Sequence, residues 1–564
     1  MIPVKKYVPA VLVIFLFVAT VITLSLNQVD YLEPNVLLYF QHLPLVYHVT
    51  VVASIIVAFR SSHKITRIIS VVVLGLLVIW TPSVMLSQPF DLDSYPFVAE
   101  PVYVARSGHL ANLHYLSENP ALGLTFGPFL LITGMNPIDF LKVYSAIAIT
   151  LMVLLVYAIA NRLKLGTTGG IVASLAFVSI LWPNVFHLSR QSFSLIYYLI
   201  SLLLLIQLLF SKPSRRILIL LCLSVVLMVL SHPATPLFFM YNLVTVLVLG
   251  RFFGRISSNE SRLIANVLMV SLSIWLFWNM LGTAPGVVYS IKDIVGGVIA
   301  SLIENPSEVS GITKIFVGRA AIYSGIINLR LALTIFAYFV SFLAPIVMYR
   351  RFRDKKLLLV LTGVVWSNMS TAVPLLLAGL PYFEKPALFL LTVWGLMVAL
   401  VYKENIAGNP HSKIRKLINV FFVILIITSS LLVPIIKYAS VPLEYAPTVE
   451  LAGQRFGESY KGNGLFIYPE DPVYLYTYVS IGLEPTRRIS SLFWSYVPGE
   501  GVNVTNAGAG ALWISTRLMS RDAFWAYTPS LKEEVERLDI SLQTRNKVYD
   551  SGWPEHIFVD TPGE

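Results

Sequence analysis

Long apolar runs dominate the first three quarters of the chain and are separated by short polar segments. We count thirteen runs of about 17–25 residues, the length that crosses a bilayer as a helix. Because backbone amide and carbonyl groups must bond internally in lipid, each run is predicted to be helical. The thirteen runs cover residues 8–26, 36–58, 68–86, 137–160, 167–183, 191–210, 217–233, 235–250, 263–280, 329–348, 357–379, 387–402 and 417–436.

The pattern changes after residue 436, where acidic residues and turns become frequent. Short apolar segments at 464–468, 511–515, 546–550 and 556–559 predict strands, and 530–538 predicts a helix beginning near Ser530. The fold class is therefore predicted to be a polytopic α-helical membrane protein with about thirteen transmembrane helices. Residues 1–436 form the membrane bundle, and 437–564 form a small external soluble α/β domain.

Composition and charge agree with this division. The chain is 56% hydrophobic and only 13% charged, which excludes a water-soluble protein over most of its length. Most Lys and Arg fall in loops on one side, and this bias predicts a cytoplasmic N-terminus. We therefore expect a multi-pass protein of the cell membrane with an extracellular C-terminal domain. The net charge of +11 is explained by topology and contact with membrane lipids, not by nucleic-acid binding.

Two external loops, 87–136 and 281–328, are longer than ordinary connections, and long loops tend to be functional. The first begins with Asp91 and Asp93, directly after an apolar run. Ionisable groups at a membrane boundary are costly to desolvate, so the pair is either a functional site or a solvated helix end. Apolar segments too short to span, such as 122–132 and 295–303, are typical of helices lying in the interface.

The residues after Asp91 follow a recognisable order. Tyr95 lies four residues on and Ala99 eight residues on, followed by Gly108, a re-entrant apolar segment and Gly134 before the next span. This order resembles the GT-C class of membrane glycosyltransferases, over about residues 87–240. That class includes protein O-mannosyltransferases, aminoarabinose transferases and oligosaccharyltransferase catalytic subunits. The Trp-Trp-Asp-Tyr-Gly motif of the oligosaccharyltransferases is missing, and the Asp motif follows the third apolar run instead of the first.

The resemblance implies a polyprenyl- or dolichyl-phosphate sugar donor and a glycan, lipid or protein acceptor. Asp91 matches the leading acid of the motif and is expected to act as general base toward the acceptor hydroxyl. Asp93 is expected to contact a metal or the acceptor. Alternatively, Asp91 and Asp93 together hold Mg²⁺ or Mn²⁺, which favour oxygen ligands.

Further residues are candidates for binding the donor. Tyr95 belongs to the motif itself, and Arg190, Lys314, Arg319 and Lys385 are cations predicted to lie outside, where a lipid phosphate needs positive charge. Glu384 precedes Lys385, and His232 lies in an outer turn between two prolines. The alternative for each cation is snorkelling to the headgroups, and for His232 it is bonding to backbone groups of the turn.

The predicted function is transfer of a sugar from a lipid-phosphate donor at the external face. The alternative is a lipid-linked glycan transporter or polymer ligase without catalysis by the Asp pair. A transporter is expected to carry ionisable residues deep within its spans, whereas here charge gathers at the outer boundary. This distribution favours an enzyme.

Overall fold

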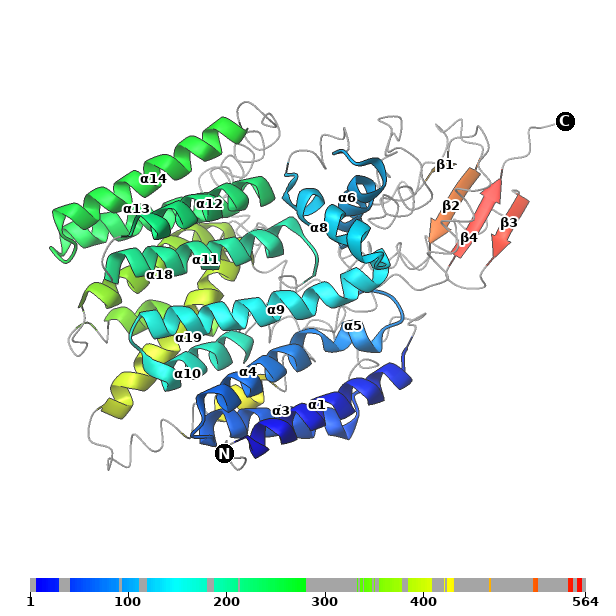
Figure 1. Ribbon diagram of the computed structural model, residues 1–564, viewed down its shortest axis with the longest axis horizontal. Coiled ribbons are helices and arrows are strands. Elements are labelled where there is room, and N and C mark those ends of the chain that lie inside the picture. The colour runs from blue at the N-terminus through cyan, green and yellow to red at the C-terminus, as the bar shows by residue number, and fades with distance from the viewer. Residues whose placement is uncertain are drawn as a thin grey trace.

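The computed structural model describes a mostly helical chain (Figure 1). The described residues are 7–29, 41–90, 94–110, 119–179, 187–210, 214–279, 332, 335–337, 339–346, 349, 355–377, 384–407, 420, 424–430, 466–467, 511–515, 546–550 and 555–559. The helices are α1 (Val8–Leu26), α3 (Leu45–Arg60), α4 (Lys64–Ile79), α5 (Thr81–Met85), α6 (Ser94–Ser107), α8 (Ala121–Thr133), α9 (Pro137–Arg162), α10 (Gly166–Ser179), α11 (Arg190–Phe210), α12 (Arg215–Ser231), α13 (Thr235–Phe252), α14 (Ser258–Trp278), α18 (Lys355–Leu377) and α19 (Glu384–Ala407).

The long helices lie side by side, with α9 near the middle of the bundle (Figure 1). Helix α9 packs against α4, α10 and α11, while α1, α3 and α4 form one margin. On the other margin α14 packs against α12 and α13, and α18 lies against α13 and α19. Asn136 starts α9 by accepting a hydrogen bond from the Ile138 amide at 2.9 Å, and Pro137 fits the first helical position.

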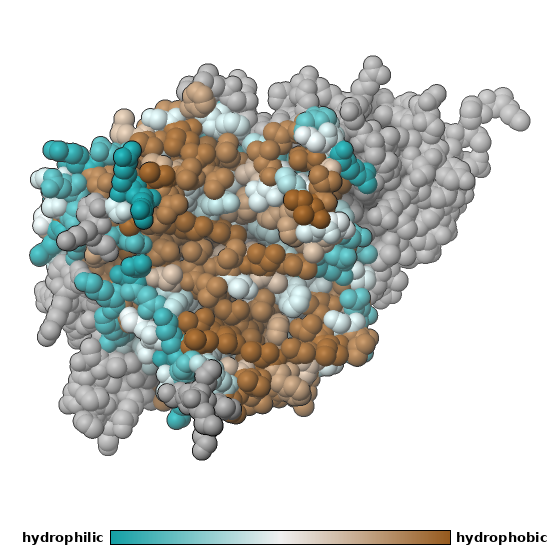
Figure 2. Space-filling model, viewed as in Figure 1, coloured by the Kyte–Doolittle hydropathy of each residue, from teal (hydrophilic) through white to brown (hydrophobic). Residues whose placement is uncertain are grey.

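Five described helices are long and apolar enough to cross a membrane: α1, α9, α11, α13 and α14. A broad apolar surface runs across the bundle between two hydrophilic edges (Figure 2). Other predicted runs form shorter helices among the described residues, since α3 has 16 residues, α10 has 14 and α12 has 17. The described chain is therefore a helical protein suited to a membrane.

Cations bond backbone carbonyls in the last turn of a helix or just after it at one end of the bundle, which we call the basic end. Arg67 Nε donates to the Ala58 carbonyl at 2.7 Å, Lys403 Nζ to the Lys164 carbonyl at 2.6 Å, and Lys356 Nζ to the Leu209 carbonyl at 2.6 Å. The last carbonyls of a helix lack partners within the helix and carry its negative dipole end, so a neighbouring cation stabilises them. These bonds tie α4 to α3, α18 to α11, and α19 to the turn that follows α9 at the basic end.

Four strands pair in the C-terminal region: β1 (Phe466–Ile467), β2 (Ala511–Ser515), β3 (Asn546–Asp550) and β4 (Glu555–Val559). Their order is β1-β2-β4-β3, with β1 parallel to β2 and the other pairs antiparallel. The four strands lie at the segments where the sequence predicts strands. The helix predicted at 530–538 lies outside the described residues, so the α/β domain remains a prediction.

Candidate functional site

The predicted site residues divide into three groups. Asp91, Asp93, Lys314 and Arg319 lie outside the described residues. Glu384 and Lys385 start α19, but only their backbone is described. Tyr95, Arg190 and His232 are described in full, and they belong to α6, α11 and the α12–α13 turn, respectively.

Arg190 forms an ion pair with Glu100, a carboxylate that is not among the predicted site residues. Its Nη2 atom lies 3.8 Å from Glu100 Oε2, and the two side chains are only 8% and 1% exposed. The guanidinium carbon also lies 5.8 Å from the centre of the Phe97 ring. Arg190 was predicted to face a donor phosphate, and in this structure its charge faces Glu100 on α6.

Glu100 also bonds the start of α8. Its Oε1 accepts a hydrogen bond from the Gly123 amide at 3.2 Å. Gly123 is the third residue of α8, and the first amides of a helix have no partner within the helix. A single carboxylate on α6 therefore caps α8 and pairs with the first residue of α11.

Glycines let α6 and α8 approach closely. A Cβ atom at Gly123 would lie 2.7 Å from Glu100 Oε1 and 2.8 Å from Glu100 Cγ, so Glu100 would have to move to make room for a side chain there. One turn later, a Cβ at Gly127 would lie 2.6 Å from Val104 Cγ1. These two glycines, four residues apart, form the face of α8 that contacts α6.

Burial raises the pKa of the Glu100 carboxyl to about 7. Attraction to Arg190 and the Gly123 hydrogen bond act in the opposite direction and do not offset the loss of solvation. The ion pair is long at 3.8 Å, which limits the attraction. Glu100 thus exchanges a proton near neutral pH in a buried position, and such groups concentrate at functional sites.

The first turn of α11 is ordered by serines. The Ser189 amide donates to Ser192 Oγ at 3.2 Å, and the Ser192 amide donates to Ser189 Oγ at 3.1 Å. Tyr144 of α9 shares a 2.9 Å hydrogen bond with Ser192 Oγ. These contacts fix the backbone that carries Arg190 and hold it against α9.

Tyr95 and His232 occupy different environments. Tyr95 lies in the first turn of α6 and is completely buried among apolar side chains. His232 Nδ1 accepts a hydrogen bond from the Thr235 amide at 3.2 Å and lies 2.9 Å from Thr235 Oγ1. The imidazole thus bonds the turn between α12 and α13. A bond to backbone groups of this turn is the alternative to substrate binding that the sequence left open for His232.

Lys142, near the start of α9, bonds the segment that precedes Asp91. Its Nζ donates to the carbonyls of Leu86 and Ser87 at 2.9 and 2.6 Å. The indole of Trp80 donates to the Lys142 carbonyl at 2.9 Å. The chain leading into the Asp pair is therefore held against α9, at the same end of the bundle as Glu100 and Arg190. We call this end the Glu100 end.

The metal prediction rests on residues outside the described ranges. Among the described residues, there is no group of three or more His, Cys, Asp or Glu side chains that could hold a metal ion. The predicted ligands Asp91 and Asp93 do not belong to that part of the chain, so the Mg²⁺ or Mn²⁺ site remains a prediction.

Comparison with known proteins finds no matching family model and no matching curated protein. The resemblance to GT-C enzymes therefore rests on the residues quoted above. Glu100 could have been found from sequence only as the next acid after the Asp pair, because its partner Arg190 lies 90 residues further along the chain.

Proposed function

We propose that this protein is a membrane glycosyltransferase of the GT-C type. It moves a sugar from a polyprenyl- or dolichyl-phosphate donor to a glycan, lipid or protein acceptor at the external face of the cell membrane. The observation that carries the proposal is the buried Glu100–Arg190 pair, together with the Gly123 contact. It fixes α6, which begins one residue after Asp93, to the end of an apolar bundle.

A fixed helix after the Asp pair matters for catalysis. A general base must lie within hydrogen-bond reach of the acceptor hydroxyl, and small displacements of a catalytic group are costly. The anchored α6 and the Lys142 contacts hold the chain on both sides of residues 91–93. This supports assigning the acceptor chemistry to Asp91, with Asp93 contacting the acceptor or a divalent ion.

The donor phosphate requires positive charge as the sugar leaves. In this proposal Arg190 contributes that charge at the Glu100 end, and Lys314, Arg319 and Lys385 supply further positive charge. Binding of a phosphate at Arg190 competes with Glu100 for the guanidinium. Uptake of a proton by Glu100, whose pKa is raised to about 7, releases Arg190 for the phosphate.

The topology belongs to the same proposal. With thirteen spans the two termini lie on opposite sides of the membrane, and the bias of Lys and Arg assigns the N-terminus to the cytoplasm and the α/β domain to the outside. The bonded cations of the basic end are what a cytoplasmic face requires. An external site next to the lipid lets a prenyl-anchored donor enter sideways from the bilayer.

A transfer assay tests the function. The full chain in lipid nanodiscs is supplied with polyprenyl-phosphate sugars and a panel of acceptors, with and without EDTA. We expect Asp91→Asn to lower transfer by about 10²–10⁴-fold, the usual contribution of a general base. Asp139→Asn, which removes an exposed acid from the first turn of α9, is the matched control and is expected to retain full activity.

Equal transfer by wild type and Asp91→Asn would exclude the catalytic role of Asp91. Restoration by Mg²⁺ or Mn²⁺ after EDTA treatment would show that transfer requires a divalent ion, as the metal-binding role of the Asp pair expects. Translocation of a lipid-linked glycan without any sugar transfer would instead identify the transporter alternative.

A further inference from the structure

Five arginines gather at one corner of the basic end. Arg215 and Arg216 start α12, Arg251 lies in the last turn of α13, Arg255 follows it in the connecting turn, and Arg262 lies near the start of α14. Helices α12, α13 and α14 pack against one another, so the five residues share one corner. All five are exposed. We call this set the arginine corner.

The turn between α13 and α14 is closely packed. Gly254 has a φ of 59°, a left-handed conformation that favours glycine, and the Arg255 amide donates to the Gly250 carbonyl at 3.0 Å. Ile256 is buried against Gly250, where a Cβ would lie 2.2 Å from Ile256 Cδ1. The backbone that carries Arg251 and Arg255 therefore has a defined shape before any ligand binds.

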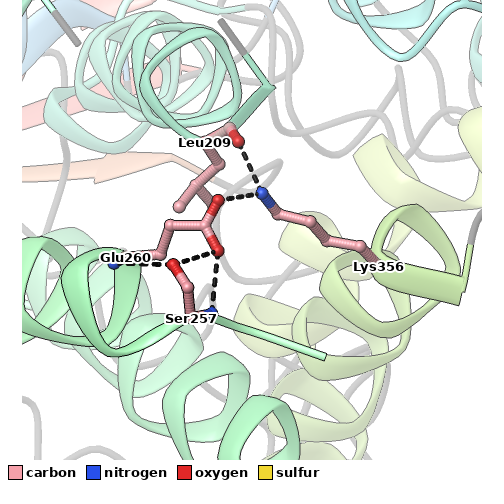
Figure 3. A network of polar contacts seen from close by, with 4 residues as sticks. All are labelled: Leu209, Ser257, Glu260 and Lys356. Carbon is pink, nitrogen blue, oxygen red and sulfur yellow. Dashed lines mark hydrogen bonds and ion pairs between the residues drawn. The ribbon is translucent and has the colours of Figure 1, made fainter. Parts of the chain in front are cut away.

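Glu260, an acid near the arginine corner, bonds Ser257 and Lys356 (Figure 3). Glu260 pairs with Lys356 of α18, and its other carboxylate oxygen accepts hydrogen bonds from the Ser257 amide and hydroxyl, both at 2.9 Å. Within the described ranges, no carboxylate forms an ion pair with any residue of the arginine corner. Glu260 thus caps α14 and balances Lys356, and within the described ranges the arginine corner keeps its positive charge.

Exposed apolar side chains continue directly from the arginine corner along the same helices. Phe252 is 81% exposed next to Arg251, and Leu220 and Met269 are exposed on α12 and α14. The space-filling view shows hydrophilic residues at this edge meeting the broad apolar surface (Figure 2). A partner at this corner therefore meets both positive charge and apolar surface. These two features complement the anionic headgroup and the acyl chains of a lipid at the membrane interface.

We infer that the arginine corner binds the phosphate headgroups of anionic phospholipids in the adjoining leaflet. Arginine suits this partner because its planar guanidinium contacts phosphate oxygens in pairs. Basic residues near a membrane surface attract anionic lipid, and the apolar faces of α12 and α14 accept the acyl chains. This inference does not depend on the proposed enzymatic function.

The test is lipid retention by the full chain. Protein purified in detergent is titrated with phosphatidylglycerol or phosphatidylcholine, and bound lipid is counted by native mass spectrometry. The test variant carries Arg251→Gln, Arg255→Gln and Arg262→Gln. The matched control carries Arg60→Gln, Lys64→Gln and Arg162→Gln, which removes three exposed charges from a different corner of the basic end.

We expect the test variant to bind phosphatidylglycerol at least about tenfold more weakly, while the control binds it like the wild type. A triple Arg→Lys variant at the same positions retains the charge but loses the paired guanidinium contacts, so it is expected to bind phosphatidylglycerol more tightly than the Gln variant and more weakly than the wild type, which separates lost charge from misfolding. Equal loss in test and control variants, or equal binding of both lipids by the wild type, would overturn the inference. A third contrary result would come from protein in phosphatidylcholine nanodiscs. If the wild type bound an oligonucleotide tightly there and the test variant did not, the inference would also be overturned.

Discussion

Glu100 connects three helices through one carboxylate. It lies on α6, accepts from the Gly123 amide of α8, and pairs with Arg190 at the start of α11. A negative group near two helix N-termini is favourable because each carries a partial positive charge there. The same carboxylate is 1% exposed, so its charge costs solvation. The balance between these effects places its proton exchange near neutral pH.

The protonation of Glu100 makes stability depend on pH. Its pKa is raised by burial to about 7 from an ordinary value of 4.5, so the folded chain binds this proton more tightly than the unfolded chain does. The stabilisation is fully present below the ordinary value and is lost as the pH rises through the folded value. We expect the melting temperature in detergent to fall between about pH 5 and pH 8, with Glu100 contributing on the order of 2–3 kcal/mol.

Glu100→Gln removes this titration and is expected to flatten the pH dependence, measured by differential scanning fluorimetry at constant ionic strength. Asp139→Asn, which changes an exposed acid, is expected to keep the wild-type slope. Parallel slopes for the wild type and Glu100→Gln would show that the buried carboxyl does not control this dependence.

Of the Glu100–Arg190 pair, only Arg190 was predicted from the sequence as a site residue. Arg190 is visible as a cation beside an apolar run, because isolated charges at span ends are easy to detect. Glu100 is not, because its importance comes from burial and from a partner that the fold brings to within 3.8 Å. His232 shows the opposite case, since its bond to the neighbouring Thr235 amide is local and belongs to the kind of contact named as the alternative to substrate binding.

At the scale of elements, the segment 87–136 contains the described helices α6 and α8. The apolar segment predicted to form a short helix at 122–132 is α8, Ala121–Thr133. The adjoining α6 packs against it through Gly123 and Gly127. The length and apolar character of α8 were predictable, but its glycine-mediated contact with α6 was not, because spacing alone does not identify the partner helix.

Gly123→Ala tests this contact. The added methyl would lie 2.7 Å from Glu100 Oε1, and Glu100 is held by Arg190 and cannot move away freely. We expect a loss of about 1–3 kcal/mol in the free energy of unfolding, typical of overpacking, measured by chemical denaturation in micelles. Thr125→Ala, at an exposed position of the same helix, is the control and should change stability by less than about 0.5 kcal/mol. Full stability of Gly123→Ala would contradict the close approach.

For the whole molecule, hydropathy predicted a helical membrane protein, and the structure has five helices long and apolar enough to cross a membrane. The count of thirteen spans remains a prediction. Helix length explains part of the difference between thirteen predicted spans and five described ones. Residues 36–58 were predicted as one span, but the described helix in this region, α3, begins only at Leu45. Proline at position 44 interrupts the run, and the residue before a proline is pushed away from helical geometry.

Cysteine accessibility tests the proposed orientation. In a Cys222→Ser background, single cysteines replace Leu92, Asp550 or Asn259, and intact cells are treated with a membrane-impermeant maleimide. We expect labelling at 92 and 550, and labelling at 259 only after permeabilisation, because Asn259 is exposed at the basic end. Protection of 92 and 550 with labelling of 259 would reverse the orientation.

The helices of the bundle differ in length and in contact with lipid. Helix α9 has 26 residues, about 39 Å at 1.5 Å per residue, whereas α1 has 19 residues, about 28 Å. The apolar window of α9 is 56% buried, but those of the marginal helices α1 and α14 are only 22% and 28% buried. Since a hydrocarbon layer is about 30 Å thick, any mismatch with a thicker or thinner bilayer falls chiefly on α1 and α14. Among the five described helices long enough to span, these two therefore have the most influence on which membrane thickness suits the protein.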